Sequence, residues 1–248
     1  MKRNLIGALA LFTLSAASAD TVTDTVKMGT EGAYTPWNFI DDAGNLTGFE
    51  IELGNELCAR AGLECEWVIN EWDTILQNLV ANNYDTIMAG MSITPSRQKS
   101  IDFTQGYFPP EPSRWVATAD LGPDIDPAGT TIGVQGGTTQ ANWVNQHLGN
   151  VAMVKEYATL DASMADLNAG VIDLVLADSF YLVPFVDGNR LFFVGQDVLL
   201  GGGVGMGIRK TDTKLKAQFN AAIDLVKADG TLDALIAKYF QAGPFYGG

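Results

Sequence analysis

The stretch YDTIMAGMSITPSR, residues 84–97, determines much of how this chain can fold and what it can hold. Thr86–Met88 is a short apolar run, which predicts a buried strand rather than a helix. After the strand, Thr94 suits the N-cap and Pro95 the first position of a helix, so Arg97 falls in its first turn. Amides, hydroxyls and a guanidinium then converge, as a carboxylate site requires. The alternative is an ordinary strand–turn–helix connection with a surface arginine.

The segments before this stretch alternate between strand and helix patterns. Val26–Gly29 and Cys65–Ile69 predict strands, with a helix between them that starts at Phe49 and ends before Gly62. Residues 72–80 carry apolar side chains at helical spacing. Such alternation predicts a parallel sheet with helices on its faces.

The second half of the chain repeats the first. WDTILQNLVANNYDTIMAG (72–90) aligns without gaps to LDASMADLNAGVIDLVLAD (160–178), and MGTEGAYT (28–35) resembles IGVQGGTT (132–139). The shared order of strands and helices predicts two lobes of similar topology. Chance similarity between two α/β segments is the alternative.

The repeat also predicts where a ligand would bind. In open α/β sheets, ligands bind beyond the carboxyl ends of the strands. If the two lobes face each other, the four turns at these ends surround one cleft. Asp178, which aligns with Gly90, would then lie across the cleft from Arg97.

Two chain segments are expected to join the lobes. Prolines stiffen the first crossing and glycines mark the second, and two crossings permit closure by rotation about a few residues. The predicted division is 20–108 with 204–248 for lobe one, 113–198 for lobe two, and 109–112 and 199–203 for the crossings.

The first 19 residues have the pattern of an export signal. Lys2 and Arg3 precede the apolar run Leu5–Leu14, and Ala17–Ala19 forms an A-x-A cleavage site. We expect an exported, soluble chain that begins near Asp20, with no lipid anchor and no membrane span. Loss of the two basic residues changes the formal charge from −14 to −16. This acidity disfavours nucleic acid and anionic membranes as partners and mildly favours cationic ligands.

The chain has two cysteines, Cys58 and Cys65, and one histidine, His147. In an exported protein, two cysteines seven apart suggest a local disulfide, and two free buried thiols are the alternative. A metal site is not expected. The sequence lacks a Ser/His/Asp set, a cysteine nucleophile and a phosphate loop, so neither catalysis nor a cofactor is predicted.

Polar residues near the predicted cleft have the chemistry to hold a zwitterion. Arg97 could hold a carboxylate bidentately, with Ser92 and Thr139 as further donors. Asp178 could accept from an ammonium group, or it could cap the helix that follows it. Glu31 would favour a cationic side chain, or it is a solvated loop acid.

Aromatic residues complete the candidate site. Tyr34 and Trp72 could sandwich a flat or long side chain and attract a positive charge. A core role is nearly as good an interpretation of Trp72, because it opens an amphipathic helix. Trp37 and Trp143 we assign to packing.

Taken together, these segments resemble a known family. The chain resembles the extracytoplasmic solute-binding proteins of polar amino-acid ABC importers, family 3, and most closely the lysine/arginine/ornithine, histidine and octopine/nopaline binding type. The resemblance implies the periplasmic-binding-protein type II fold: α/β, with two α/β lobes, a two-strand hinge and a ligand cleft that closes like a Venus flytrap. The matching motifs are GTEGAYTPWNF (29–39), GFEIELGNELCARAGLEC (48–65), EWDTILQNL (71–79), YDTIMAGMSITPSRQKSIDFT (84–104), GVQGGTTQ (133–140) and GMGIRKTDTKLKAQFNAAI (205–223).

The resemblance implies a role for individual residues. It implies a disulfide between Cys58 and Cys65. Glu31 is glutamate where the family more usually has aspartate. By this resemblance, Arg97 clamps the α-carboxylate, with Ser92 and Thr139 as hydroxyl donors, and Asp178 accepts from the α-ammonium. Tyr34 and Trp72 form the aromatic pair that flanks the ligand side chain, and Glu31 is the acid that recognises it.

Three cleft positions depart from the lysine/histidine type. Ala89 and Gly90 stand where that type has two serines, and Gln135 stands where it has leucine. These changes make the pocket more like that of an opine binder, whereas Asp178 suits a free ammonium better than the secondary amine of an opine. We therefore expect a basic L-amino acid, with an opine-binding protein or an exported dehydratase on the same scaffold as alternatives.

The resemblance also implies a cellular role in amino-acid transport. We expect a monomeric periplasmic receptor, without enzymatic activity or cofactor, that captures arginine, lysine, ornithine or histidine. Its expected macromolecular partner is an inner-membrane ABC permease.

Overall fold

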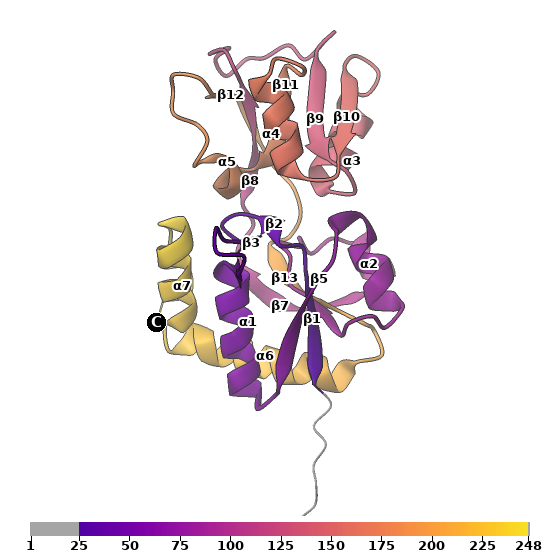
Figure 1. The fold of residues 1–248 in the computed structure, drawn as a ribbon, viewed down its shortest axis with the longest axis vertical. Coiled ribbons are helices and arrows are strands. Elements are labelled where there is room, and N and C mark those ends of the chain that lie inside the picture. The colour runs from indigo at the N-terminus through magenta and orange to yellow at the C-terminus, as the bar shows by residue number, and fades with distance from the viewer. Residues whose placement is uncertain (1–24, 248) are drawn as a thin grey trace, which may run out of the picture.

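The structure is a computed structural model that describes residues 25–247. Two five-stranded sheets, each flanked by helices, form two lobes joined by two narrow connections (Figure 1). The predicted export signal, residues 1–19, lies outside the described residues. Across 25–247, no helix is long and apolar enough to span a membrane.

Lobe one is built on the sheet β5-β1-β6-β13-β7. A small second sheet, β2-β3-β4, follows β1 in the chain. The strands are β1 Val26–Thr30, β2 Ala33–Tyr34, β3 Asn38–Ile40, β4 Leu46–Thr47, β5 Cys65–Ile69, β6 Thr86–Ile87, β7 Asp102–Phe108 and β13 Val204–Ile208. The helices are α1 Phe49–Ala61, α2 Trp72–Val80, α6 Thr213–Ala228 and α7 Thr231–Phe240.

Lobe two is built on the sheet β10-β9-β11-β8-β12. Its strands are β8 Pro112–Ala117, β9 Thr131–Gln135, β10 Met153–Tyr157, β11 Leu174–Asp178 and β12 Phe192–Leu199. Its helices are α3 Thr139–Leu148, α4 Leu160–Asn168 and α5 Ser179–Leu182.

The predicted repeat is present in both the topology and the detail of the two lobes. The sheet orders correspond strand for strand, with β1 and β6 in the places of β9 and β11. Asp85 accepts a hydrogen bond from the backbone N–H of Lys27 at 2.9 Å. The aligned Asp173 accepts from the N–H of Thr131 at 2.7 Å. Both aspartates thus fasten the start of an equivalent strand, β1 in lobe one and β9 in lobe two.

The aligned glycines of the repeat have the same packing role. A Cβ on Gly29 would lie 2.6 Å from the ring of Tyr84, and one on Gly133 would lie 2.4 Å from Ile172. Tyr84 and Ile172 are themselves aligned positions. In each lobe the residue two positions before β6 or β11 therefore lies against the backbone of the neighbouring strand, β1 or β9, which leaves no room for a side chain there.

The parallel pairing predicted for the alternating strands is confirmed for β1 with β5 and with β6, but each complete sheet is mixed. β13 runs antiparallel to β6 and β7, and β8 runs antiparallel to β11 and β12. These are the two strands that enter a sheet directly from the other lobe. Because no crossover helix returns the chain to the starting edge of the sheet, each runs opposite to its neighbours.

The predicted helix after Pro95 is wrong. The chain forms only a 3-10 turn, Arg97–Lys99, before β7 begins at Asp102. Thr94 still accepts from the N–H of Arg97 at 3.2 Å, as its predicted capping role requires. The segment is too short for an α-helix, because the chain must rejoin the sheet within five residues of Arg97.

Aromatic side chains form much of the core of lobe one. Trp37 is fully buried, and its ring lies 4.8 Å from those of Phe108 and Phe240. In lobe two, Trp143 packs against Trp115 with ring centroids 6.2 Å apart. The assignment of Trp37 and Trp143 to packing is confirmed.

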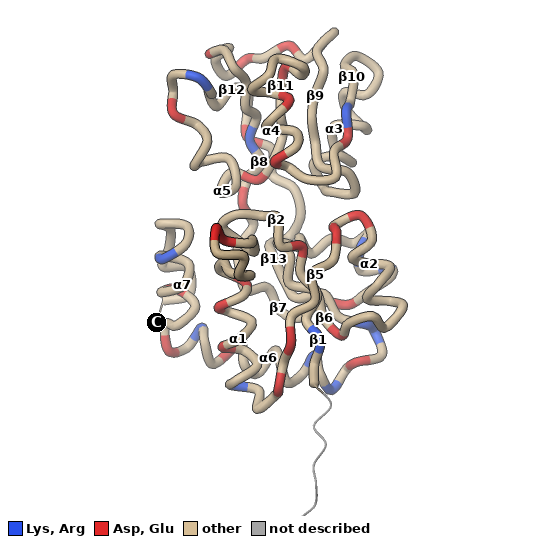
Figure 2. The backbone as a smooth tube through the Cα atoms, viewed as in Figure 1, with Lys and Arg blue, Asp and Glu red and all other residues tan. Residues whose placement is uncertain are grey.

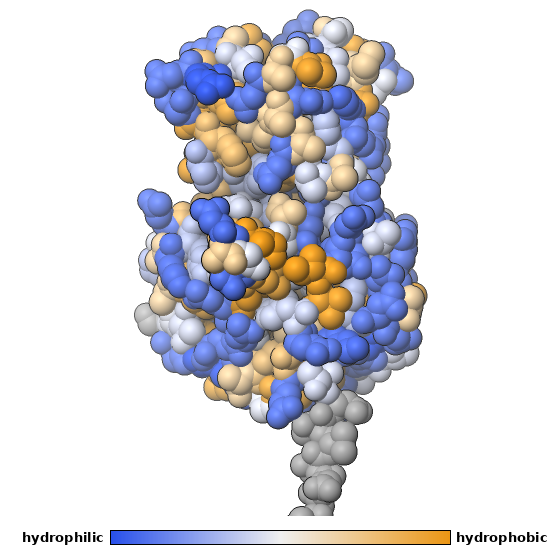
Figure 3. All heavy atoms as spheres, viewed as in Figure 1, coloured by the Kyte–Doolittle hydropathy of each residue, from blue (hydrophilic) through white to orange (hydrophobic). Residues whose placement is uncertain are grey.

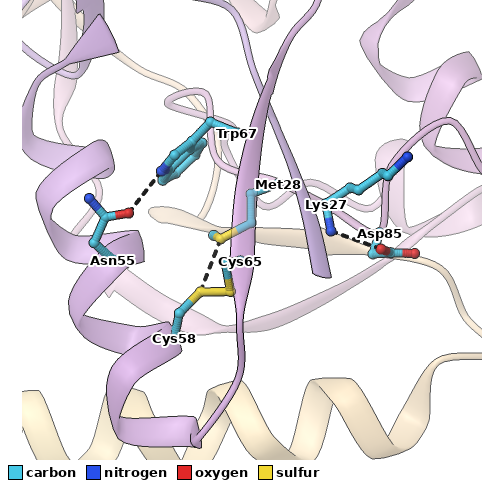
Figure 4. The surroundings of a disulfide bond; sticks show 7 residues. All are labelled: Lys27, Met28, Asn55, Cys58, Cys65, Trp67 and Asp85. Atoms are coloured by element: carbon cyan, nitrogen blue, oxygen red, sulfur yellow. Dashed lines mark hydrogen bonds between the residues drawn. A yellow bond between two sulfur atoms is a disulfide. The ribbon is translucent and has the colours of Figure 1, made fainter. Parts of the chain in front are cut away.

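A disulfide joins Cys58, in the last turn of α1, to Cys65, the first residue of β5 (Figure 4). This confirms the predicted pairing and fixes the end of the helix to the start of the strand. Met28 of β1 lies beside the bridge, with its sulfur 3.2 Å from the sulfur of Cys58. The bridge is therefore part of the lobe-one interior rather than a surface clip.

The surface follows the acidic composition of the chain. Acidic residues are spread over both lobes and also lie where the lobes approach each other (Figure 2). The face shown in Figure 3 is largely hydrophilic, with an apolar area on lobe one near β2, β3 and β5. Ile40 and Ile69, at the ends of β3 and β5, are exposed large apolar residues of these strands.

Candidate functional site

A cavity lies between the lobes, at the carboxyl ends of β1, β6, β9 and β11. Its empty volume, which includes space open to solvent, is about 410 Å³. All ten residues named from the sequence line it: Glu31, Tyr34, Trp72, Ala89, Gly90, Ser92, Arg97, Gln135, Thr139 and Asp178. The repeat brings them together, because strand ends that align in sequence face each other across the cleft. Their contact with a ligand stays a prediction.

Arg97 is half-buried, and its guanidinium forms no ion pair among residues 25–247. One of its nitrogens donates to the backbone carbonyl of Ser92 at 2.9 Å, and its charge lies 5.2 Å from the centre of the Trp72 ring. None of the ion pairs in the described part of the chain includes it. Burial lowers the pKa of Arg97 to about 10, so it stays charged at neutral pH. Its remaining donors are available to a carboxylate in the cavity.

Asp178 ends β11 on the opposite side of the cavity. Its Oδ1 accepts from Gln140 at 2.7 Å, and its Oδ2 accepts from the hydroxyl of Tyr34 in lobe one. Burial raises the pKa of Asp178, and these two bonds oppose the shift. The capping alternative is wrong, because its side chain makes no cap bond to α5. Instead Glu111, in the first connection, accepts from the N–H of Phe180 at 3.4 Å.

Glu31 follows β1 directly and is 7% exposed, which excludes the alternative of a solvated loop acid. Its Oε1 accepts from the side-chain amide of Gln135 at 2.6 Å, and the same amide donates to the carbonyl of Ala158 at 2.9 Å. Burial raises the pKa of Glu31 to about 7, with smaller contributions from Asp161 and Asp73. The structure thus holds a carboxylate in the cavity with a neutral donor and no cation.

Two hydrogen bonds cross the cleft and define a closed arrangement. The hydroxyl of Tyr34 donates to Asp178, and Gln135 donates to Glu31. Each bond joins one lobe to the other, so both would break if the lobes separated. Closure therefore completes the site from two incomplete halves.

Gly90 is closely covered by an aromatic ring. Its φ is +58°, and a Cβ there would lie 2.5 Å from Cε1 of Tyr34. Tyr34 also stacks on Tyr181 of lobe two, with centroids 5.6 Å apart. The ring of Tyr34 therefore fills the space beside Gly90.

Sequence reasoning missed five lining residues: Thr138, Gln140, Leu160, Leu176 and Ala177. Gln140 is buried and bridges Ser113, at 2.9 Å, to Asp178. Thr138 accepts from the N–H of Ala141 and is the N-cap of α3, so Thr139 is the first residue of the helix. A threonine directly before a helix is a signal that could have found this cap.

Comparison with known proteins agrees with this geometry. The family model "Bacterial extracellular solute-binding proteins, family 3" matches residues 26–242. The chain belongs to this family. It is 34% identical to the lysine/arginine/ornithine-binding periplasmic protein of Escherichia coli K12, over 97% of this chain and 98% of that protein. It is 36% identical to the L-arginine-binding protein of Pseudomonas aeruginosa PAO1, over 97% of this chain and 96% of that protein.

One similar protein has been solved with a ligand bound. The structure of a periplasmic His/Glu/Gln/Arg/opine family-binding protein from Silicibacter pomeroyi in complex with lysine superposes with a TM-score of 0.83. The two chains are 52% identical, and the match covers 89% of this solute-binding chain and 100% of that one. The fold is therefore the type II periplasmic-binding-protein fold, and the relatives are periplasmic binding proteins rather than enzymes.

Proposed function

We propose that the chain binds a basic L-α-amino acid (arginine, lysine, ornithine or histidine) in the cavity between its lobes. One observation carries the proposal: the same cavity holds the Arg97 guanidinium with no acidic partner among residues 25–247 and the Glu31 carboxylate held only by a neutral amide. A ligand with a carboxylate at one end and a cation at the other satisfies both groups. The names of the relatives and the lysine complex of the solved one support this ligand class.

The amino-acid head group fits the two opposed lobes. The α-carboxylate lies at Arg97, with Ser92 and Thr139 as donors, and the α-ammonium lies at Asp178. Charge-assisted hydrogen bonds of this kind are among the strongest that a cavity can offer. Because Arg97 comes from lobe one and Asp178 from lobe two, one zwitterion draws the lobes together.

The far end of the cavity favours a positive side chain. Both amide hydrogens of Gln135 are used, one by Glu31 and one by Ala158, so its oxygen remains free as an acceptor. If the Gln135 amide were turned around, its oxygen would face the ionised Glu31 carboxylate and the Ala158 carbonyl, and neither of these can donate a hydrogen bond. The orientation of the amide is therefore fixed while Glu31 is ionised. The second oxygen of Glu31 is a further acceptor. A side-chain carboxylate would meet only acceptors here and would be repelled.

An opine is disfavoured by the packing around Gly90. An opine carries a second carboxylate on its α-amine, which needs space and donors near Asp178. The ring of Tyr34 covers Gly90, and its hydroxyl and Gln140 already donate to Asp178. A free α-ammonium is smaller than the substituted amine of an opine, and its N–H groups can donate to the Asp178 carboxylate.

The same arrangement fits a delivery protein. We propose that residues 20–108 with 204–248 move against 113–198 about 109–112 and 199–203, and that the closed, monomeric form docks on an inner-membrane ABC permease. Export through residues 1–19 would place this exchange in the periplasm. We propose no catalysis; incubation with prephenate or arogenate should yield no product.

A thermal-shift screen tests the ligand class. L-lysine, L-ornithine, L-arginine and L-histidine are compared with L-norleucine, L-glutamate and octopine, each far above a micromolar Kd. A basic ligand at a hundred times its Kd should raise the unfolding midpoint by roughly 5–10 °C. Norleucine keeps the α-groups and lacks the terminal cation, so it should give a smaller shift. A response confined to glutamate, octopine or small apolar amino acids would overturn the proposal.

A further inference from the structure

A fully buried acid lies behind the ligand cavity and does not line it. Glu50, in the first turn of α1, is 0% exposed. The N–H of Gly90 donates to both of its oxygens, at 2.8 and 2.9 Å. The side-chain amide of Asn38 donates to Oε2 at 2.7 Å, and the hydroxyl of Tyr107 donates to Oε1. Four hydrogen bonds therefore converge on a carboxylate that has no cation beside it in the described ion pairs.

Two of the three groups that donate to Glu50 can only donate in this arrangement. A backbone N–H can only donate, which settles the contact with Gly90. The amide of Asn38 cannot turn around, because its oxygen accepts from the N–H of Gly32 at 2.8 Å. These hydrogen bonds and the N-terminus of α1 favour the ionised carboxylate, and they oppose the burial that raises the pKa of Glu50 to about 7. An amide in place of Glu50 would bring two donor hydrogens into a ring of donors.

This acid connects the two lobe-one loops that carry the site. One loop follows β1 and reaches Glu50 through Gly32 and Asn38. The other follows β6 and reaches it through Gly90. The first loop presents Glu31 and Tyr34, and the second leads to Ser92 and Arg97. Glu50 holds both from behind, and the ring of Tyr34 packs over Gly90 in front.

We propose that Glu50 is a positioning residue for ligand binding: it sets the spacing of the two lobe-one loops, and so the placing of Tyr34 and Gly90 before the lobes meet. It touches no ligand and acts through Gly90 and Asn38. The proposal rests on the proposed function only for the choice of L-lysine as the probe.

The test compares two buried acids of lobe one. Glu50→Gln keeps the shape and removes the charge. Asp233→Asn is the matched control, because Asp233 of α7 is also buried and collects backbone amides, from Phe245 at 2.7 Å and Tyr246 at 3.1 Å, but does not line the cavity. Calorimetry with L-lysine and the unfolding midpoint are measured for both variants and the unchanged chain.

We expect both variants to lower the midpoint and only Glu50→Gln to weaken L-lysine binding, by about tenfold or more. A general loss of stability would not separate the two variants in this way. Affinity within twofold of the unchanged chain in Glu50→Gln overturns the proposal, as does an equal loss in Asp233→Asn.

A second measurement needs no ligand and separates this proposal from the proposed function. Amide hydrogen exchange of the unliganded protein should show slow exchange at Gly90 and Gly32, and Glu50→Gln should speed both more than the other lobe-one amides. If no amino acid binds but this pattern holds, the proposed function fails and the role of Glu50 in holding the loops stands. Fast exchange at both glycines in the unchanged chain overturns that role.

Discussion

The carboxyl ends of β6 and β11 are equivalent places in the two lobes and are used in opposite ways. At the end of β6, Gly90 offers no side chain, gives its N–H to Glu50 and is covered by Tyr34. At the end of β11, the aligned Asp178 points its carboxylate into the cavity. A repeated scaffold thus contributes an anion from one lobe and a plain backbone surface from the other.

The difference extends to the chain that follows each strand. After β6 the chain turns through Ser92 to Arg97, whereas after β11 it enters α5 directly. Of the two charged groups expected to hold the amino-acid head group, lobe one therefore supplies the cation, Arg97, and lobe two supplies the anion, Asp178. A duplicated α/β unit can thus present opposite charges to one cavity when the two copies diverge at a few strand-end positions.

Removal of the lobe-one cation should have the largest effect. Arg97→Ala leaves the ligand carboxylate buried without its partner, which should weaken L-lysine binding by about 3–5 kcal/mol. Calorimetry measures this, with Arg114→Ala as control, since Arg114 pairs with Asp197 and does not line the cavity. Micromolar or tighter binding by Arg97→Ala would show that the two lobes do not divide the charges as described.

A side chain at the bare strand end should have the next largest effect. Gly90→Ala places a Cβ against Tyr34, and overpacking of this kind should weaken L-lysine binding by roughly 1–3 kcal/mol. Gly62→Ala is the matched control, because Gly62 also has positive φ, +66°, but has no atom within 4 Å of the added Cβ. Gly62→Ala should lower stability and leave affinity unchanged. Equal affinities for the two variants would show that the contact between position 90 and Tyr34 does not affect L-lysine binding.

Much of this asymmetry could be predicted from the sequence. The gapless alignment of 72–90 with 160–178 placed Asp178 opposite Gly90, and the structure has both at the cavity. The antiparallel course of β8 and β13 could not be predicted, because it depends on the entry of the chain from the other lobe. The covering of Gly90 by Tyr34 is a contact between distant segments, which helical or strand spacing does not report.

The sequence contains a signal for the burial of Glu50. Glu50 precedes Leu53, Gly54 and Leu57 at helical spacing, and all four residues are buried on one face of α1. A charged residue in an apolar stripe indicates a buried partner, yet the sequence alone names neither Asn38 nor Gly90 as that partner. The burial of Glu31 against Gln135 depends likewise on how the lobes meet.

The affinity for a cationic ligand should depend on pH through Glu31. The pKa of Glu31 is about 7 without ligand, because it is buried near Asp161, Asp73 and Glu50. A bound cation favours the ionised form, so below pH 7 the ligand must displace a proton. Binding of L-lysine should be about tenfold weaker at pH 6 than at pH 8.

Calorimetry at pH 6, 7 and 8 measures this dependence, and Glu31→Gln is the control. The variant should bind L-lysine more weakly at pH 8 and lose most of the pH dependence. The pH dependence that remains in this variant is expected to come from Glu50, because burial also raises the pKa of Glu50 to about 7. Stronger binding at pH 6 than at pH 8 would mean that Glu31 does not face the cation.

The disulfide should have the smallest effect on binding. The double change Cys58→Ser and Cys65→Ser opens a short loop within lobe one and should lower the free energy of unfolding by about 2–3 kcal/mol. Neither cysteine lines the cavity, so the affinity for L-lysine should stay within twofold. A large loss of affinity at unchanged stability would show that the bridge, rather than the strand ends, sets the site.

The most direct test of the opposed charges is a crystal structure with L-lysine bound. We expect the α-carboxylate within hydrogen-bond distance of Arg97, the α-ammonium at Asp178, and the terminal ammonium at Glu31 and the side-chain oxygen of Gln135. A ligand bound in the reverse direction, with its carboxylate toward Glu31, or bound outside the cleft, would contradict this expectation.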